Sequence, residues 1–105
     1  DGRVDLANNL RNKYTYLSDT WAYRLVTTYG TDSFALLGEC LQLQQLGKDF
    51  GATLTQTEIA WLLKHEFAKT AEDIIWRRTK LGLQLTPQQI QDIADWVQDH
   101  QDLAA

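Results

Sequence analysis

Hydrophobic residues recur every three to four positions along most of the chain, which is the spacing of amphipathic helices. The clearest stripe follows Ser18, a residue type that caps the first free N–H groups of a helix. Gly30 stops this helix, because glycine adopts the left-handed conformation at low cost. The apolar stripe consists of Ala22, Leu25, Val26 and Tyr29. The pattern therefore predicts a helix between Ser18 and Gly30.

A second helix is predicted to begin at Thr31 or Asp32, with Gly38 in its middle as a point where it can split. Gly47 closes this segment, and the loop after it offers Phe50 as an anchor into the core. The residues expected to face inward from the second helix are Phe34, Leu37 and Leu41.

Three later helices are predicted from threonines followed, three residues on, by an acid or an amide, the spacing of a capping box. These pairs are Thr55 with Glu58, Thr70 with Asp73, and Thr86 with Gln89, the last strengthened by Pro87 at the first helical position. The middle helix of the three should end near Lys80, before Gly82. The inward residues expected on the outer two are Ile59, Leu62, Leu63, Phe67, Ile90, Ile93, Ala94 and Val97.

No segment alternates with a period of two for long enough to predict a strand, so the fold class is all-α, a small bundle of four to five short helices. Residues 1–16 show only a weak helical spacing, and we interpret them as an extended or irregular lead-in that can include one helical turn. Residues 17–105 then form the helical domain.

The amino-acid composition argues against several classes of function for this chain. A single cysteine, Cys40, excludes an internal disulfide and favours a reducing compartment. The formal net charge of -4 argues against a nucleic-acid partner, because phosphate binding needs basic residues. No apolar run is long enough to cross a bilayer. A chain that begins at Asp1 without Met is expected to be a processed product or a fragment.

Motifs for catalysis, cofactors or metal are missing. The run His65-Glu66-Phe-Ala-Lys69 resembles the zinc-protease helix, but Lys69 stands where the second histidine ligand is needed. No phosphate loop, no dinucleotide glycine motif and no calcium loop occurs. We therefore predict no catalytic, cofactor-binding or metal-binding residue in this chain.

Glu66 and Arg78 are the charged residues that the pattern places on apolar stripes, Glu66 after Leu63 and Arg78 after Ile75. A buried charge without a partner is costly, so we predict an ion pair between Glu66 and Arg78 or its neighbour Arg77. Asp73 and Arg77 add a pair four residues apart. In the alternative interpretation, Glu66 is a general base and an arginine binds an anion. The structural role is favoured, because ion pairs between packed helices are commoner than active sites in so small a domain.

Three stretches, in this order, resemble the C-terminal domain of the FAD-dependent glycerol-3-phosphate dehydrogenases and the related glycerophosphate oxidases. They are RLVTTYG, LGKDFG and EIAWLLKHEFAKTAEDIIWRRTKLGLQL, and the likeness extends over residues 10–100. The matching positions are Tyr29, Gly30, Glu58, His65, Glu66, Asp73, Arg77, Arg78, Thr79 and Gly82.

The resemblance implies a parent flavoenzyme of the bacterial type that oxidises glycerol 3-phosphate to dihydroxyacetone phosphate and reduces a quinone. FAD and the catalytic residues would lie in preceding domains. The chain would be an inactive C-terminal domain that packs on the catalytic part, and a homodimer is left open. The parent would be cytoplasmic and peripheral on the inner face of the cell membrane, the domain reaching the membrane only through it.

Two alternative functions would place the chain in other classes of protein. A stand-alone helical interaction module would lack an upstream FAD-binding region. A helix-turn-helix regulator is suggested by LTPQQIQDIADWV, but it would lack a basic recognition helix.

Overall fold

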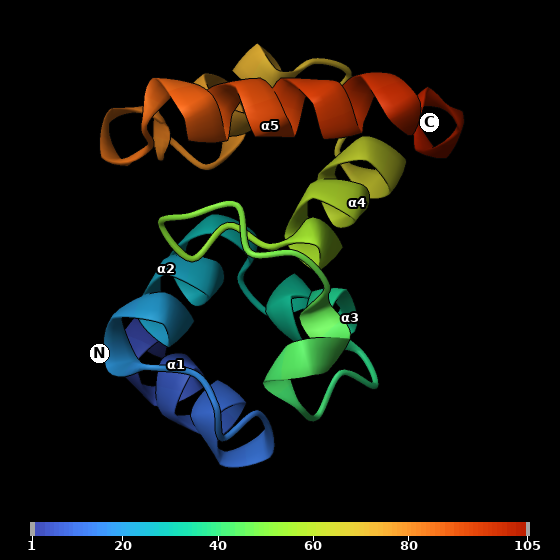
Figure 1. The fold of residues 1–105 in the computed structure, drawn as a ribbon. Coiled ribbons are helices and arrows are strands. Elements are labelled where there is room, and N and C mark those ends of the chain that lie inside the picture. Colours follow the sequence, from blue (N-terminus) through green and yellow to red (C-terminus); the bar gives the residue numbers. More distant parts are fainter. Residues whose placement is uncertain (1, 105) are drawn as a thin grey trace. The chain divides into compact units, whose positions relative to one another are not determined.

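The computed structural model describes residues 2–104. All the regular secondary-structure elements in this range are helical, which confirms the all-α fold class (Figure 1). The only strand-like feature in this range is a single antiparallel bridge between Asp49 and Thr55. The α-helices are α1 (Gly2–Lys13), α2 (Asp19–Tyr29), α3 (Asp32–Leu37), α4 (Gln56–His65) and α5 (Pro87–Asp99). Shorter helical segments are η1 (Leu43–Leu46), η2 (Asp73–Arg78), η3 (Gly82–Gln84) and η4 (Gln101–Leu103).

The chain divides into two compact units, the first ending at Leu46 and the second beginning at Gly47. The first unit contains α1, α2, α3 and η1, and the second contains α4, α5 and the remaining short segments. The proposed division into a linker of residues 1–16 and a domain of residues 17–105 stays a prediction about the parent protein.

The first sixteen residues differ from the irregular lead-in expected of them, because Gly2–Lys13 forms the three-turn helix α1. Ala7 and Leu10 are buried, and α1 packs along α2. The local pattern is weak since most other α1 positions face solvent. Packing against α2 supplies the stabilisation that the local sequence lacks.

Helix α2 agrees with its predicted start, end and inward face. The Ser18 hydroxyl accepts a hydrogen bond from the Trp21 N–H at 3.1 Å, and Gly30 ends the helix with φ of +58°. All four residues of the predicted stripe are buried: Ala22, Leu25, Val26 and Tyr29.

Helix α3 is shorter than expected, because Gly38, at φ +51°, ends it after Leu37. Leu37 is buried as predicted, and Phe34 is half-buried. Leu41 lies beyond the helix end and is 51% exposed, so its inward placement was wrong. The physical reason is that a helical period cannot be continued across a glycine that terminates the helix.

Two tyrosine hydroxyls hold the end of α3 in the first unit. Tyr14, which is fully buried, donates to the carbonyl oxygens of Gly38 at 2.6 Å and Phe34 at 3.2 Å. Tyr16 donates to the Cys40 carbonyl at 2.8 Å. Burial, with smaller contributions from Cys40 and Tyr14, raises the pKa of Tyr16 to about 12.

Helix α4 begins after Thr55, and Ile59, Leu62 and Leu63 are fully buried as predicted. The Thr55 side chain forms no capping hydrogen bond, however, and Glu58 is itself buried, so the predicted capping function of Thr55 is wrong. Thr55 is buried and forms the antiparallel bridge with Asp49. The start of α4 is therefore packed against protein and is not an exposed cap.

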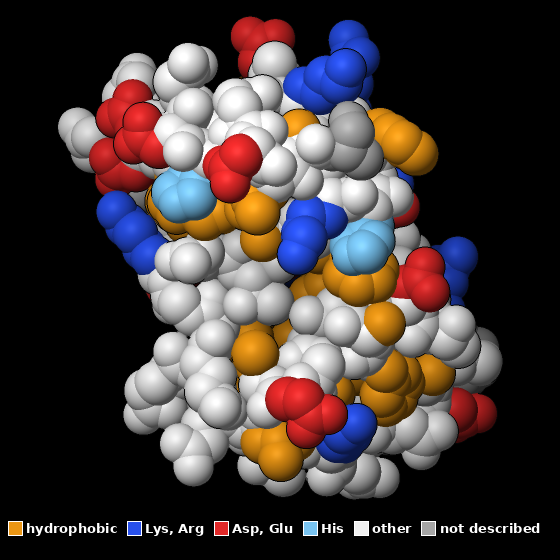
Figure 2. All heavy atoms as spheres, turned by 90° about the vertical axis from the view of Figure 1, so that its right-hand side faces the viewer, with side chains coloured by type: hydrophobic (Ala, Val, Ile, Leu, Met, Phe, Trp, Pro, Cys, Tyr) orange, Lys and Arg blue, Asp and Glu red, His pale blue; other side chains and the backbone are white. Residues whose placement is uncertain are grey.

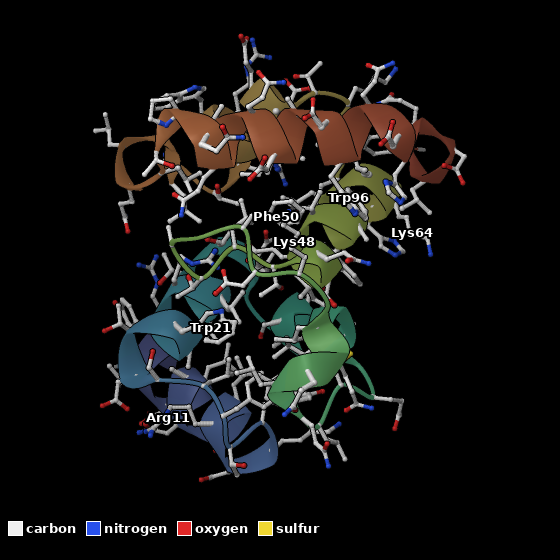
Figure 3. The ribbon with its side chains drawn as sticks, in the orientation of Figure 1. Arg11, Trp21, Lys48, Phe50, Lys64 and Trp96 are labelled. Atoms are coloured by element: carbon white, nitrogen blue, oxygen red, sulfur yellow. The ribbon has the colours of Figure 1, made fainter. Side chains whose placement is uncertain are left out.

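Helix α5 begins with the predicted capping box, in which Thr86 accepts from the Gln89 N–H and Gln89 accepts from the Thr86 N–H. Ile93 and Val97 are buried, and Ile90 and Ala94 are half-buried. Phe50 is buried as predicted and meets Trp96 of α5 edge to face, with ring centroids 6.4 Å apart (Figure 3).

Candidate functional site

The charged residues singled out in the sequence gather at the corner where α4 ends and η2 begins. Helix α4 finishes at His65, and the N–H groups of Glu66 and Ala68 both donate to the Leu62 carbonyl. Phe67 between them has φ of +59°, a conformation in which glycine is usual at a helix end. This backbone turns the Phe67 side chain outward, where it is 72% exposed, so its predicted place in the core was wrong.

Asp73 holds the start of the next helical segment. Its Oδ2 accepts from the N–H of Lys69 at 3.1 Å and of Thr70 at 3.2 Å, while the Thr70 hydroxyl accepts from the Asp73 N–H. The predicted acidic capping box is therefore formed. The Lys69 N–H, followed by Thr70 and the charge of Arg77, holds the pKa of the Asp73 carboxyl below its usual value.

The four charged residues meet in two ion pairs. Glu66 accepts a hydrogen bond from Nη2 of Arg78, across the corner. Arg77 lies 3.6 Å from Asp73 and is 80% exposed at its side chain. Of the two arginines expected to reach Glu66, the structure brings Arg78 to it.

The burial expected of this pair was wrong, since the side chains of Glu66 and Arg78 are 27% and 41% exposed. The reason lies in η2, which is a π-helix: the N–H of Thr79 donates to the carbonyl of Ile74, five residues back, at 2.9 Å. The wider turn rotates Arg78 off the stripe of Ile74 and Ile75, which remain buried. The spacing rule of the α-helix does not apply across it.

Each histidine lies against a tryptophan four residues earlier, His100 stacked on Trp96 at 12° between ring planes and His65 tilted against Trp61 at 37°. His65 lies 4.1 Å from Trp61, and His100 lies 3.8 Å from Trp96, measured between ring centroids. His100 Nδ1 is also 2.7 Å from the Trp96 carbonyl oxygen. Figure 2 shows both histidines in pale blue beside hydrophobic side chains. The repeated Trp-x-x-x-His spacing at the ends of α4 and α5 was a readable signal that our sequence interpretation missed.

In the described range, no group of three or more His, Cys, Asp or Glu residues is arranged to bind a metal ion. Nor does any helix among these residues have the length and apolar character needed to cross a membrane. The charged corner therefore offers carboxylates already bound by guanidinium and N–H groups. Such an arrangement ties two helical segments together.

Surface hollows occur in both units. In the first unit, a hollow of about 460 Å³ lies between α1 and α2. Its wall includes Arg11, which is labelled in Figure 3 and forms an ion pair with Asp19 at 2.5 Å. In the second unit, a smaller one of about 250 Å³ is lined by Lys48, Phe50, Trp96 and the aspartates of α5. Lys48 already lies over the Phe50 ring there, 5.1 Å from its centroid.

Comparison with known proteins gives a family match over residues 1–102, to the C-terminal domain of alpha-glycerophosphate oxidase. The chain is 36% identical to the aerobic glycerol-3-phosphate dehydrogenase of Escherichia coli (strain K12) over 98 residues, 93% of this chain and 20% of that protein. It is 41% identical to a glycerol-3-phosphate dehydrogenase of Pseudomonas aeruginosa over 93 residues, 89% of this chain and 18% of that protein.

A third relative carries a different substrate in its name. The chain is 34% identical to the D-erythritol 1-phosphate dehydrogenase of Brucella abortus over 90 residues, 86% of this chain and 18% of that protein. The chain thus spans about a fifth of the length of the curated relatives it matches.

Proposed function

We propose that this chain, which belongs to the family of C-terminal domains of alpha-glycerophosphate oxidase, is the non-catalytic C-terminal domain of an FAD-dependent glycerol-3-phosphate dehydrogenase. The parent reaction would convert glycerol 3-phosphate and a quinone to dihydroxyacetone phosphate and a quinol. The observation that carries the proposal is the match of nearly the whole chain to about a fifth of two bacterial glycerol-3-phosphate dehydrogenases.

The residues of this chain support a structural role within such a parent. The sequence has no dinucleotide glycine motif, and in this proposal the flavin is bound by the preceding domains. At the charged corner, Glu66 and Asp73 serve as partners of arginines and backbone N–H groups. These ion pairs and hydrogen bonds fit a domain that packs on the catalytic part or helps to assemble it.

The parent's setting is part of the same proposal. It would be a cytoplasmic enzyme, peripheral on the inner face of the cell membrane, with this domain reaching the membrane only through the parent. A homodimer of the parent is compatible with it. A dehydrogenase is favoured over an oxidase by the names of the two glycerol-3-phosphate relatives.

The test is to express the full-length parent and the isolated chain side by side. The parent is expected to show a flavin absorbance band and to reduce an artificial dye with glycerol 3-phosphate. The isolated chain should do neither. Erythritol 1-phosphate serves as the competing substrate, because the Brucella abortus relative is named for it. A parent without flavin, or one that prefers the erythritol ester, would overturn the proposal.

A further inference from the structure

The second unit presents an exposed apolar ridge that its own core does not use. Trp76 of η2 is 48% exposed, and Leu83 of η3 is 91% exposed. Isolated exposed apolar residues are common on protein surfaces, so the informative question is whether these two side chains are contiguous.

Gly82 joins them. A Cβ atom built on Gly82 would lie 2.4 Å from two ring carbons of Trp76, so the indole ring rests directly on the Gly82 backbone. Leu83 is the next residue. The Trp76 ring is therefore seated on the buried Gly82 backbone, and Leu83 extends from the residue that follows it.

The ridge is flanked by cations. Arg77 is 80% exposed at its side chain, and its ion pair with Asp73, at 3.6 Å, is long. Lys80 is also exposed. Residues 64–80 contain five of the ten Lys and Arg residues of the chain, whereas residues 81–105 contain none and carry four aspartates. Within the second unit, basic side chains thus concentrate in the segment that holds Trp76, whereas Leu83 lies in the segment that has none.

We propose that this ridge, Trp76 and Leu83 with Arg77 and Lys80, is the surface by which the domain docks on the rest of its parent chain. The occupant is an apolar pocket bordered by carboxylates on the preceding part of that chain. The inference rests on the proposed function, because the curated relatives are about five times as long as the matched segment. Tryptophan and arginine are the residue types that dominate protein interfaces, and the flanking cations select an acidic border.

The experiment uses the full-length parent with a photo-reactive benzoyl-phenylalanine in place of Leu83. Gln98, exposed on α5 outside the ridge, carries the same group in a matched control. We expect irradiation to cross-link position 83 to peptides that precede this chain in the same polypeptide, and position 98 to give little such product. Arg77→Glu should lower the yield from position 83, because it reverses a flanking charge.

A second variant displaces the ring without removing it. Gly82→Ala introduces a methyl group where the Trp76 ring now lies, so the ring must swing away and the cross-link from position 83 should be lost. Circular dichroism of each variant confirms that the helices have formed. A product that joins position 83 to lipid, or to a second copy of the parent, or no product in a folded protein, would overturn the docking proposal.

Flavin absorbance and glycerol 3-phosphate oxidation, measured on the same preparations, keep the two proposals apart. A flavin-containing, active parent without the cross-link contradicts the docking surface alone. A parent with neither flavin nor activity contradicts the proposed function.

Discussion

The two units of the chain secure their polar groups by different chemistry. In the first, neutral tyrosine hydroxyls donate to backbone carbonyls, and Tyr14 does so from a fully buried position. The first unit has an exposed ion pair as well, between Arg11 and Asp19, but in the second unit capping boxes and ion pairs hold the helix junctions at partly exposed sites. Removing one partner of a buried hydrogen bond leaves a desolvated group, whereas water replaces much of what an exposed ion pair provides. The first unit should therefore be more sensitive to single polar changes and less sensitive to salt.

The largest effect should come from the core of the first unit. Leu10 is fully buried, so Leu10→Ala should lower the free energy of unfolding by about 2–5 kcal/mol. Leu6, half-buried on the same helix, is the control, and Leu6→Ala should cost clearly less. Urea unfolding followed by circular dichroism measures both. Equal, small effects would mean that α1 is not packed as described.

Tyr14→Phe tests the neutral hydrogen bonds directly. The variant keeps the ring but removes the hydroxyl that donates to the Gly38 carbonyl, while the Phe34 carbonyl keeps its bond from the Gly38 N–H, so a loss of about 1–3 kcal/mol is expected. The loss should be the same at low and high salt. Thermal melts at two salt concentrations provide the measurement, and a salt-dependent loss would contradict the neutral interpretation.

Glu66→Ala tests the opposite chemistry. Because Glu66 and Arg78 are both partly exposed, the loss should stay below about 1 kcal/mol and shrink further as salt is added. A buried pair would have cost about 3–5 kcal/mol, which is what the sequence pattern suggested. Glu66→Gln keeps a hydrogen-bond acceptor and should cost less still. A salt-insensitive loss in the larger range would restore the buried interpretation.

The smallest effect should be the pH dependence carried by Asp73. Its pKa is lower in the folded state than in the unfolded chain, so its charge stabilises the fold at a pH above the usual value. That stabilisation disappears as the pH falls through the lowered pKa, when the folded state also takes up the proton. The difference in melting temperature between the wild type and Asp73→Asn should therefore be present at neutral pH and vanish in acid. A difference that grows in acid would have the wrong sign.

Local signals predicted the parts of the fold that depend on local chemistry. The cap at Ser18, the capping boxes at Thr70 and Thr86, and the α2 stripe all use groups within one helical turn of each other, and the structure contains them. Helix α1 could not be predicted in the same way, because its stabilisation comes from α2.

The charged corner shows the same limit at a single site. The partners Glu66 and Arg78 could be chosen from charge and sequence distance, and the structure brings them together. Their exposure could not be predicted, because it depends on whether the turn at η2 has the α or the π period. No residue type between Asp73 and Arg78 dictates that choice.

The π-helix η2 has a consequence for chains of slightly different length. A π-turn closes its hydrogen bond over five residues, so it accommodates one residue more than an α-turn does. Deleting one residue between Asp73 and Arg78 would allow the ordinary bond over four residues to form. A chain shortened by one residue here could thus keep a continuous helix that leads into η3. Its charged side chains would then point in different directions. The wide turn is a place where the polypeptide can absorb a one-residue deletion without unfolding its surroundings.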